Sequence, residues 1–380
     1  MKAWHRIALL LFAIGWGANH FVSLLLMYRD RLALDPAAPA ILLGIYALGL
    51  VPGLILSGPL SDRYGRRAIV LPGAVIALAA SALLGAGGDS FVLLLAGRLV
   101  YGVGCGAVMN PGAVWVLEES GDVAGGGGAR RATIALSAGF GFGPLLSGVL
   151  AQYAPAPTLL PYAVHVVVLA AAIAIAATAP GGRRSPTSQP GPLLRIGLDA
   201  TNRGAFLAGI APMAPFVFAF PAIAFAALPA MLGSDALGSA PIAYIGVLAA
   251  ITLAAGVLAQ PVTRRFAPIP AARVGLVIGA AGCALGAAAV AWHVVPLLVA
   301  SAAILGAGYG VCMTAGLRRV ELIARAETRG GLTGLYYVLA YIGMAAPWLL
   351  ALATRSALTG PQSLLVVAAL AVLAAFGLRA

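Results

Sequence analysis

Charged side chains are scarce in this chain of 380 residues, because Asp, Glu, Lys and Arg together make up only 9% of it. A soluble globular domain carries about 25% of these residues. Hydrophobic residues make up 62% of the chain, and its mean hydropathy is +1.01. This composition excludes an ordinary soluble protein and leaves little room for soluble domains. We therefore predict a polytopic membrane protein.

Acidic residues are the rarer of the two charge classes, with 11 Asp and Glu against 23 Lys and Arg and a net charge of +12. Such an excess could indicate nucleic-acid binding. Here the basic residues cluster in short loops between apolar runs, where positive charge sets membrane topology. We therefore expect a lipid bilayer as the surroundings and no nucleic-acid partner.

Cysteine is also rare, and Cys105, Cys283 and Cys312 all lie inside apolar segments without metal-ligand spacing. We expect them to be small, buried packing residues. The sequence has no phosphate-binding loop with Walker spacing, no convincing pair of nucleophile and base, and no metal-binding cluster. We therefore expect a protein that is not an enzyme, needs no cofactor or metal and is not driven by ATP.

Long apolar runs dominate what is present, and each is close to the roughly 20 residues that a membrane-spanning helix needs. The basic start, Met1 to Arg6, and the run after it could mimic a signal peptide. That run lacks a convincing cleavage site and leads into further spans, so we predict a retained helix. The twelve predicted spans are 6–28, 38–60, 68–87, 91–117, 130–153, 160–179, 204–228, 240–262, 273–292, 295–317, 330–353 and 362–378.

The longest polar interval, Pro180 to Arg203, divides these spans into six and six. We predict an N-terminal bundle over 1–180, a cytoplasmic linker over 181–203 and a C-terminal bundle over 204–380. Three features recur in both halves at offsets of 202 to 204 residues. They are 102–106 with 306–310, 59–63 with 261–265, and Pro144 with Pro347. Landmarks in the same order predict two parallel six-helix repeats.

Basic residues also predict the orientation. If the N-terminus is cytoplasmic, 19 of the 23 Lys and Arg residues fall on the inner side. Only Arg29, Arg31 and Arg355 fall outside, and Arg98 lies within a span. We therefore expect both termini in the cytoplasm.

The loop between the second and third spans is short and densely charged. Gly58, Asp62, Gly65, Arg66 and Arg67 fit the pattern Gly-x-x-x-Asp-x-x-Gly-Arg-Arg. This pattern resembles the signature loop between helices 2 and 3 of the major facilitator superfamily, and the whole chain resembles its twelve-helix, drug-efflux-type members. The resemblance implies an all-α integral membrane fold of two pseudo-symmetric six-helix bundles that meet around a substrate site.

In that family the loop acid docks near the start of helix 11 and helps to lock one alternating state, while loop arginines pair with an acid at the inner end of helix 4. Charge that only sets topology would explain the arginines but not Asp62 or the glycine spacing. The second copy has Arg264 where Asp62 stands, so any lock is expected to be one-sided. The gating candidates are Gly58, Asp62, Arg63, Gly65, Arg66, Arg67, Glu118 and Glu119.

Arg98 is a charged residue inside a span, where a charge is expensive and needs a partner. Arg98, Gly102 and Gly104 resemble the Arg-x-x-x-Gly-x-Gly pattern of helix 4 in the family, whose arginine is discussed as a proton-coupling or structural group. The alternative is that Arg98 snorkels to the outer interface from the first turns of its helix.

The fifth span carries a run of glycines and one proline. Gly139, Gly143, Pro144 and Gly148 resemble the antiporter motif that is typical of exporters, although Ser147 replaces one glycine and Arg130 falls where the earliest glycine would stand. The alternative is close helix packing without a bearing on transport direction.

Polar and aromatic residues inside spans are candidates for the substrate cavity. Trp16, Asn19, His20 and Ser23 are spaced to share one helix face, and so are Tyr337, Tyr341, Met344 and Trp348. Either face could instead serve helix packing or interhelical hydrogen bonding. The cavity candidates are Trp16, Asn19, His20, Tyr101, Asn110, Tyr309, Tyr337 and Tyr341, and the coupling candidates are Arg98 and His20.

No Asp or Glu lies in the middle of any predicted span, although many proton-coupled members carry one there. Coupling would therefore need His20, His165, a terminal acid such as Asp30 or Asp35, or Glu118; histidine suits the task because its ordinary pKa is about 6.5.

The leading functional prediction is a monomeric secondary transporter of the cell inner membrane. It exports an amphipathic or drug-like small molecule in exchange for protons. Import or uniport of a small metabolite stays open, as does a non-transporting receptor on the same fold.

Overall fold

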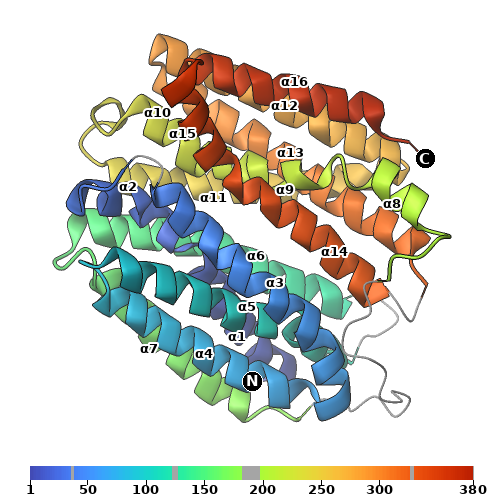
Figure 1. Cartoon of the computed structure of the whole chain (residues 1–380). Helices are drawn as coiled ribbons and strands as arrows, with labels where there is room; N and C mark the ends of the chain where they lie inside the picture. Colours follow the sequence, from blue (N-terminus) through green and yellow to red (C-terminus); the bar gives the residue numbers. More distant parts are fainter. Residues whose placement is uncertain (36–37, 122–126, 182–196, 326–328, 380) are drawn as a thin grey trace. The chain divides into compact units, whose positions relative to one another are not determined.

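The computed structural model describes residues 1–35, 38–121, 127–181, 197–325 and 329–379, and these residues form helices and connecting turns without a strand. Figure 1 shows the helices along the chain. The described residues contain twelve helical segments long and apolar enough to cross a membrane. The prediction of an all-α protein with twelve spans is therefore confirmed.

The helices of the first half are α1 (Ala3–Asn19), α2 (Phe21–Arg31), α3 (Ala38–Tyr64), α4 (Arg66–Ala86), α5 (Phe91–Glu119), α6 (Gly127–Tyr153) and α7 (Leu160–Ala177). Those of the second half are α8 (Arg203–Gly209), α9 (Ala214–Ala222), α10 (Leu228–Leu232), α11 (Pro241–Ala259), α12 (Pro268–Trp292), α13 (Val295–Ile323), α14 (Arg329–Ile342), α15 (Ala346–Ser356) and α16 (Gly360–Gly377).

Contacts divide the chain into two compact units. Unit 1 contains Met1–Leu24 and Ile45–Arg195, and unit 2 contains Leu25–Gly44 and Ile196–Ala380. The predicted domain boundaries at 180 and 204 remain predictions. Most of the predicted linker, 182–196, lies outside the described residues.

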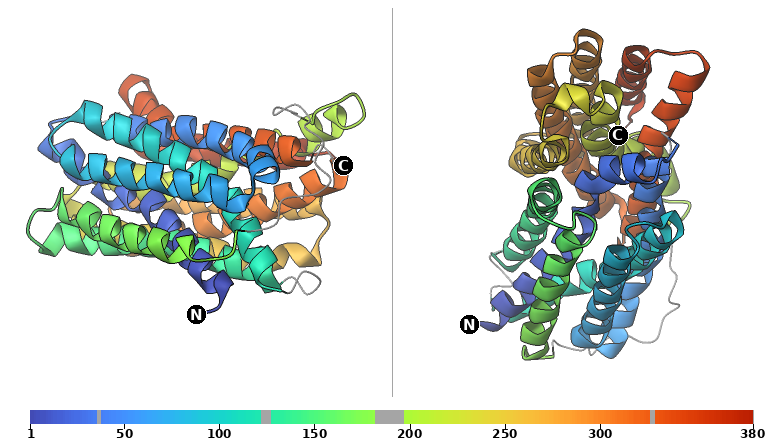
Figure 2. Two further views of the ribbon diagram at one scale, coloured as in Figure 1. Left: turned by 90° about the horizontal axis from the view of Figure 1, so that it is seen from below. Right: turned by 90° about the vertical axis from the view of Figure 1, so that its left-hand side faces the viewer.

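Within unit 1, α1 is the central element. It packs against α5, α6 and α7, and α4 packs against α5 and α7 (Figures 1 and 2). The buried part of α1 runs from Ile7 to Ala18 and includes Trp16. Trp16, a cavity candidate on α1, is therefore a buried residue.

Within unit 2, α13 is the central element. It packs against α9, α11 and α12, while α12 also packs against α16 and α9 against α14 (Figure 1). The core is almost wholly apolar, and Phe206, Phe220 and Tyr336 are among its largest buried side chains.

Glycines reveal that the two units share one packing scheme. A methyl group on Gly106 would lie 2.4 Å from the carbonyl oxygen of Leu50 in α3, and one on Gly310 would lie 1.9 Å from that of Gly256 in α11. Only glycine allows two helix backbones to approach this closely. The recurring glycine motif is thus the contact between α5 and α3 in unit 1 and between α13 and α11 in unit 2, as expected of pseudo-symmetric repeats.

Three spans that the sequence suggests are continuous are interrupted in the structure. The first breaks at His20, between α1 and α2. The seventh is divided into α8, α9, a π-helical segment (Ile223–Ala227) and α10, and it contains Pro215, Pro221 and Pro229. Proline removes a backbone donor and disturbs the preceding turn, which explains the division of the seventh span.

The eleventh span is also broken, which corrects the prediction that Tyr337, Tyr341, Met344 and Trp348 share one helix face. Helix α14 ends at Ile342, a tight turn covers Gly343–Ala345, and α15 follows. Pro347 lies four residues after Gly343, which is where its ring conflicts with the helix ladder. Met344 is buried, whereas Trp348 is exposed.

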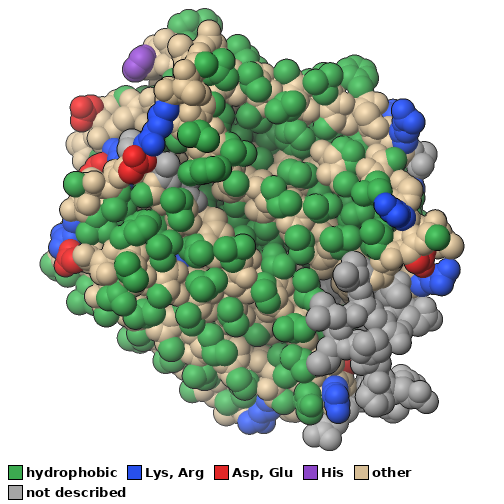
Figure 3. Space-filling model, viewed as in Figure 1, with side chains coloured by type: hydrophobic (Ala, Val, Ile, Leu, Met, Phe, Trp, Pro, Cys, Tyr) green, Lys and Arg blue, Asp and Glu red, His purple; other side chains and the backbone are tan. Residues whose placement is uncertain are grey.

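Hydrophobic side chains cover the helices on the face shown in Figure 3, and the coloured charges lie toward the helix ends. Large apolar residues such as Val92, Leu373 and Phe376 are more than 60% exposed. Such exposure suits lipid contact, because the hydrocarbon core of a bilayer is as apolar as these side chains.

Helix α6 offers a sharp test of close packing. A methyl group on Gly143 would lie 2.3 Å from the carbonyl oxygen of Trp16, whereas one on Gly141 would meet nothing within 4 Å. We expect Gly143→Ala to cost about 1–3 kcal/mol through overpacking. Gly141→Ala, the matched control, should leave stability unchanged or slightly raised. Thermal unfolding in detergent, followed by fluorescence-detected gel filtration, measures both; equal melting temperatures would contradict the role of Gly143.

Candidate functional site

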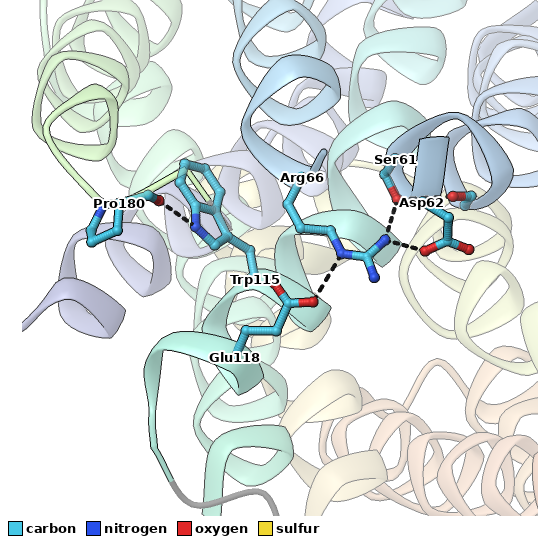
Figure 4. A network of polar contacts seen from close by, with 7 residues as sticks. Ser61, Asp62, Arg66, Trp115, Glu118 and Pro180 are labelled. Atoms are coloured by element: carbon cyan, nitrogen blue, oxygen red, sulfur yellow. Dashed lines mark hydrogen bonds and ion pairs between the residues drawn. The ribbon is translucent and has the colours of Figure 1, made fainter. Parts of the chain in front are cut away.

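Arg66 organises the charged loop of unit 1 (Figure 4). Its guanidinium donates to Ser61 Oγ at 2.8 Å and to Glu118 Oε1 at 3.2 Å, and it forms an ion pair with Asp62. The Arg66 side chain is only 10% exposed, compared with 21% for Glu118 and 47% for Asp62. One buried cation therefore joins the end of α3, the start of α4 and the end of α5.

Gly65 makes the turn into this network possible. Its φ of 96° lies in the region that side-chain-bearing residues rarely adopt. Of the other gating candidates, Arg63 lies over the ring of Tyr64 with 5.4 Å between the guanidinium carbon and the ring centroid. Gly58 has open space around its α-carbon. The turn thus aims Arg66 inward and leaves Arg63 outside the network.

The end of α7 is fixed to the same region by side chains that donate to its last carbonyls. Arg6 Nη1 donates to the Thr178 carbonyl at 3.0 Å. Trp115 Nε1 donates to the Pro180 carbonyl at 2.9 Å, as Figure 4 shows. Arg67 Nη1 lies 3.4 Å from the Ala179 carbonyl. These bonds satisfy carbonyls that a helix end leaves unpaired.

At the equivalent turn of unit 2, the described side chains include no acidic counterpart to this network. Arg318 donates instead to the backbone carbonyls of Thr263 and of Phe266, the latter at 3.1 Å. The first unit thus uses side-chain carboxylates where the second uses backbone carbonyls. This difference agrees with the sequence, which has Arg264 in the place of Asp62.

Arg98 lies deep in unit 1 and is 1% exposed. Its guanidinium donates to the Ala18 carbonyl at 3.1 Å and stacks over the rings of Phe21, at 4.8 Å, and Tyr46, at 4.5 Å. Arg98 therefore points into the unit, and the snorkelling alternative does not describe its position.

Two further side chains donate to carbonyls of α1 close to Ala18. Tyr101 Oη donates to the Ile14 carbonyl at 3.0 Å, and His165 Nε2 lies 2.9 Å from the Ala13 carbonyl. A side chain that engages a helix carbonyl is a recognised cause of helix bending. Three such bonds along one stretch of α1 give a physical reason for the break at His20.

His20 lies within this cluster and is 0% exposed. Its ring centroid is 4.7 Å from that of Tyr162 and 4.9 Å from that of His165. Among the described residues, neither ring nitrogen of His20 has a hydrogen-bond partner. The structure thus brings the coupling candidates Arg98 and His20 into one buried cluster together with Tyr101 and His165.

The remaining cavity candidates are spread over both units. In unit 1, Trp16 is buried, Asn19 is partly buried and Asn110 is exposed. In unit 2, the rings of Tyr341 and Phe218 stack at 4.3 Å, and Tyr309 lies 6.0 Å from Phe218. Tyr337 is adjacent to Tyr336, at 5.7 Å.

Several residues that complete these sites carry no sequence motif. Ser81 bonds to His165 Nδ1 at 2.8 Å, and Tyr46 donates to Cys105 Sγ at 3.2 Å. Phe218 belongs to an unbroken apolar run. All three cysteines are buried, as predicted. Within the described residues, no group of three or more His, Cys, Asp or Glu side chains could hold a metal ion.

Comparison with known proteins decides the family. The model of the Major Facilitator Superfamily matches residues 7–346. The chain belongs to the major facilitator superfamily.

Solved structures of this superfamily share the fold. The structure of a mutant of the nucleoside transporter NupG has a TM-score of 0.79 and 15% identity, with 99% of this chain and 98% of that chain covered. A D-xylose-proton symporter has a TM-score of 0.75 and 17% identity, with coverages of 98% and 95%. At these identities the likeness concerns the fold alone.

Curated relatives match over shorter segments. The 4-hydroxybenzoate transporter PcaK of Pseudomonas aeruginosa is 41% identical over 90 residues, which are 24% of this chain and 18% of that protein. The glucose transporter GlcP of Staphylococcus epidermidis is 30% identical over 124 residues, which are 31% and 27%. The matched segments thus span only about a fifth to a quarter of these relatives. The family and the twelve apolar helices among the described residues make the chain a multi-pass membrane protein of this superfamily.

The Arg66 network predicts that two substitutions, each replacing a carboxylate by an uncharged amide, lower the stability of the protein by different amounts. Glu118→Gln removes the less exposed carboxylate, and we expect it to cost about 1–3 kcal/mol because Arg66 stays buried. Asp62→Asn should cost less than about 1 kcal/mol, because half-exposed ion pairs contribute little. Melting temperatures in detergent test this order. Arg63→Lys is the control outside the network, and a larger loss for Asp62→Asn than for Glu118→Gln would contradict the assignment.

Proposed function

We propose that this transporter moves a small organic solute by alternating access of its two halves and couples the movement to protons. The observation that carries the proposal is the Arg66 network at one end of unit 1. It joins three helix ends through one buried cation, and its acid Asp62 has no counterpart in the repeat. A one-sided network of this kind can stabilise one state of a two-state cycle over the other.

Proton coupling is supported by the buried cluster around Arg98 and His20. Ionisable residues at membrane depth are costly and generally mark ion or substrate pathways. One structural relative, the D-xylose-proton symporter, also has a proton-linked activity.

Export of an amphipathic solute in exchange for protons is the first candidate for direction. It rests on the resemblance of Gly139, Gly143, Pro144 and Gly148 to the antiporter motif. Gly139 and Gly143 serve a close contact with α1, because a methyl group on either would lie only 2.1 Å or 2.3 Å from the carbonyl oxygen of Phe12 or Trp16. That contact is compatible with either direction.

Uptake of a small metabolite is the second candidate, favoured by the solutes that the relatives transport. These relatives are described as transporters of 4-hydroxybenzoate and glucose and as a symporter of D-xylose with protons. The stacked pair Phe218 and Tyr341 supports a solute that presents a ring, because an aromatic face packs well against a flat apolar surface.

For location, we propose the cell inner membrane, a cytoplasmic position for both termini and function as a monomer. The distribution of basic residues supports this orientation, because Arg6, Arg67 and Arg318 cap helix ends on the side predicted to face the cytoplasm.

Transport in proteoliposomes tests the proposal. The probes are ethidium, D-xylose and 4-hydroxybenzoate, each followed with an imposed pH gradient in either direction. We expect one probe to move against its gradient with the wild type and to stop when a protonophore is added. Asp62→Asn should slow this movement about tenfold, as a barrier change of about 1.4 kcal/mol would.

Asp235→Asn is the matched control, because Asp235 is an exposed acid at the start of a short 3-10 helix (Asp235–Leu237) outside the Arg66 network. Movement of a probe down its own gradient, without dependence on pH, would contradict proton coupling and indicate uniport. Equal movement of all probes in wild-type and protein-free vesicles would contradict transport of these solute classes.

A further inference from the structure

The imidazole of His20 is buried, and its hydrogen-bonding groups have no partner among the described residues. The side chain is 0% exposed, and both ring nitrogens lack a partner among the described residues. A neutral imidazole carries one donor and one acceptor, and a protonated one carries two donors. Buried polar groups are nearly always hydrogen-bonded, so an exception in a native structure needs an explanation.

His165, the other buried histidine, is fully satisfied. Its Nε2 faces the Ala13 carbonyl at 2.9 Å and must donate, because a carbonyl only accepts. Its Nδ1 then accepts from Ser81 Oγ at 2.8 Å. These partners fix His165 as a neutral Nε2–H tautomer, which makes it a positioning residue for α1 rather than a carrier.

Among the described residues, the groups found around the His20 ring include no carboxylate. Helix α5 contributes Arg98 and Tyr101, and α7 contributes Tyr162 and His165. The ionisable residues of α4 and α6 lie only toward the ends of those helices. Protonation of His20 in this state would therefore add a second cation beside the Arg98 guanidinium, with no acceptor among the described residues for either N–H.

The position of His20 in the backbone adds a second observation. It is the residue between α1 and α2, and its carbonyl accepts a bond from Ser23 Oγ at 3.2 Å. Conformational changes are absorbed at element-terminal residues. The unsatisfied ring thus sits at the point of the first span where the backbone is already interrupted.

We infer that His20 is the residue that takes up and releases the coupled proton, an inference that rests on the proton coupling of the proposed function. In the state described here the ring is neutral, and Arg98 opposes its protonation. In the alternate state water reaches the ring, one imidazole nitrogen binds a proton from that side, and the same proton returns to water on the other side. No other bond is made or broken.

Histidine-selective nitrogen-15 NMR in lipid nanodiscs tests the inference without a solute. The chain has four histidines, and His5 and His293 are exposed. A lower pH favours the state that binds the proton, so between about pH 8 and about pH 5 we expect the His20 signals to change from neutral to doubly protonated as the state open to water becomes populated. The His165 signals should keep the Nε2–H tautomer. A His20 ring that stays neutral throughout would overturn the inference.

Signals are assigned by His20→Gln, and also by elimination from His5→Gln, His165→Gln and His293→Asn. The assignment therefore survives if His20→Gln fails to fold. Asn suits position 293, because His293 has a φ of 54° and Asn tolerates this left-handed conformation.

A transport assay separates this inference from the function on which it rests. It uses whichever of ethidium, D-xylose and 4-hydroxybenzoate the wild type moves. His20→Gln should abolish accumulation driven by the pH gradient and keep exchange of the probe across the membrane, whereas His293→Asn should keep both. Gradient-driven accumulation retained by His20→Gln would overturn the role of His20 alone. Absence of pH dependence in the wild type would overturn the proposed coupling, even if His20 titrates in the NMR experiment.

Discussion

The cost of placing a polar or charged group away from water determines most of this structure. Backbone amides in hydrocarbon must bond within their own segment, so the spans are helices. Charged side chains collect toward the helix ends, where water is available (Figure 3). Because charge inside a span is so expensive, the exceptions carry the most information. Arg98 and His20 are such exceptions, and both lie in the same cluster of unit 1.

The two units meet this constraint in different ways. In unit 1, Arg66 is neutralised by carboxylates at the helix ends, and Arg98 is accommodated by the Ala18 carbonyl and two aromatic faces. In unit 2, the described core is apolar and aromatic, and Arg318 is satisfied by backbone carbonyls. The repeats thus share backbone packing, as Gly106 and Gly310 show, while ionisable chemistry is concentrated in the first. Such a division suits a transporter in which one half responds to protons and the other contacts the solute.

The sequence predicts the fold well because its signals are local and strong. Apolar length gives the twelve spans, and the pattern from Gly58 to Arg67 gives the family. Interruptions are harder to predict. Pro347 could have indicated the turn at Gly343, since its position four residues later is where the ring disturbs the ladder. The break at His20 has no such signal, because the side chains associated with it, Arg98, Tyr101 and His165, come from distant segments.

The candidate sites also divide into features that a local sequence signal predicts and features that depend on distant segments. Arg66, Asp62 and Glu118 could be named from the sequence, because a motif fixes the first two and a helix end the third. Whether each buried polar side chain finds hydrogen-bond partners could not be predicted from the sequence. His20 and His165 are both histidines in apolar runs, yet Ser81 and a backbone carbonyl satisfy one and nothing described satisfies the other. A hydroxyl on α4 and a carbonyl on α1 therefore separate a structural histidine from a candidate proton carrier. Only the three-dimensional arrangement reveals this difference, because it depends on which atoms face each ring.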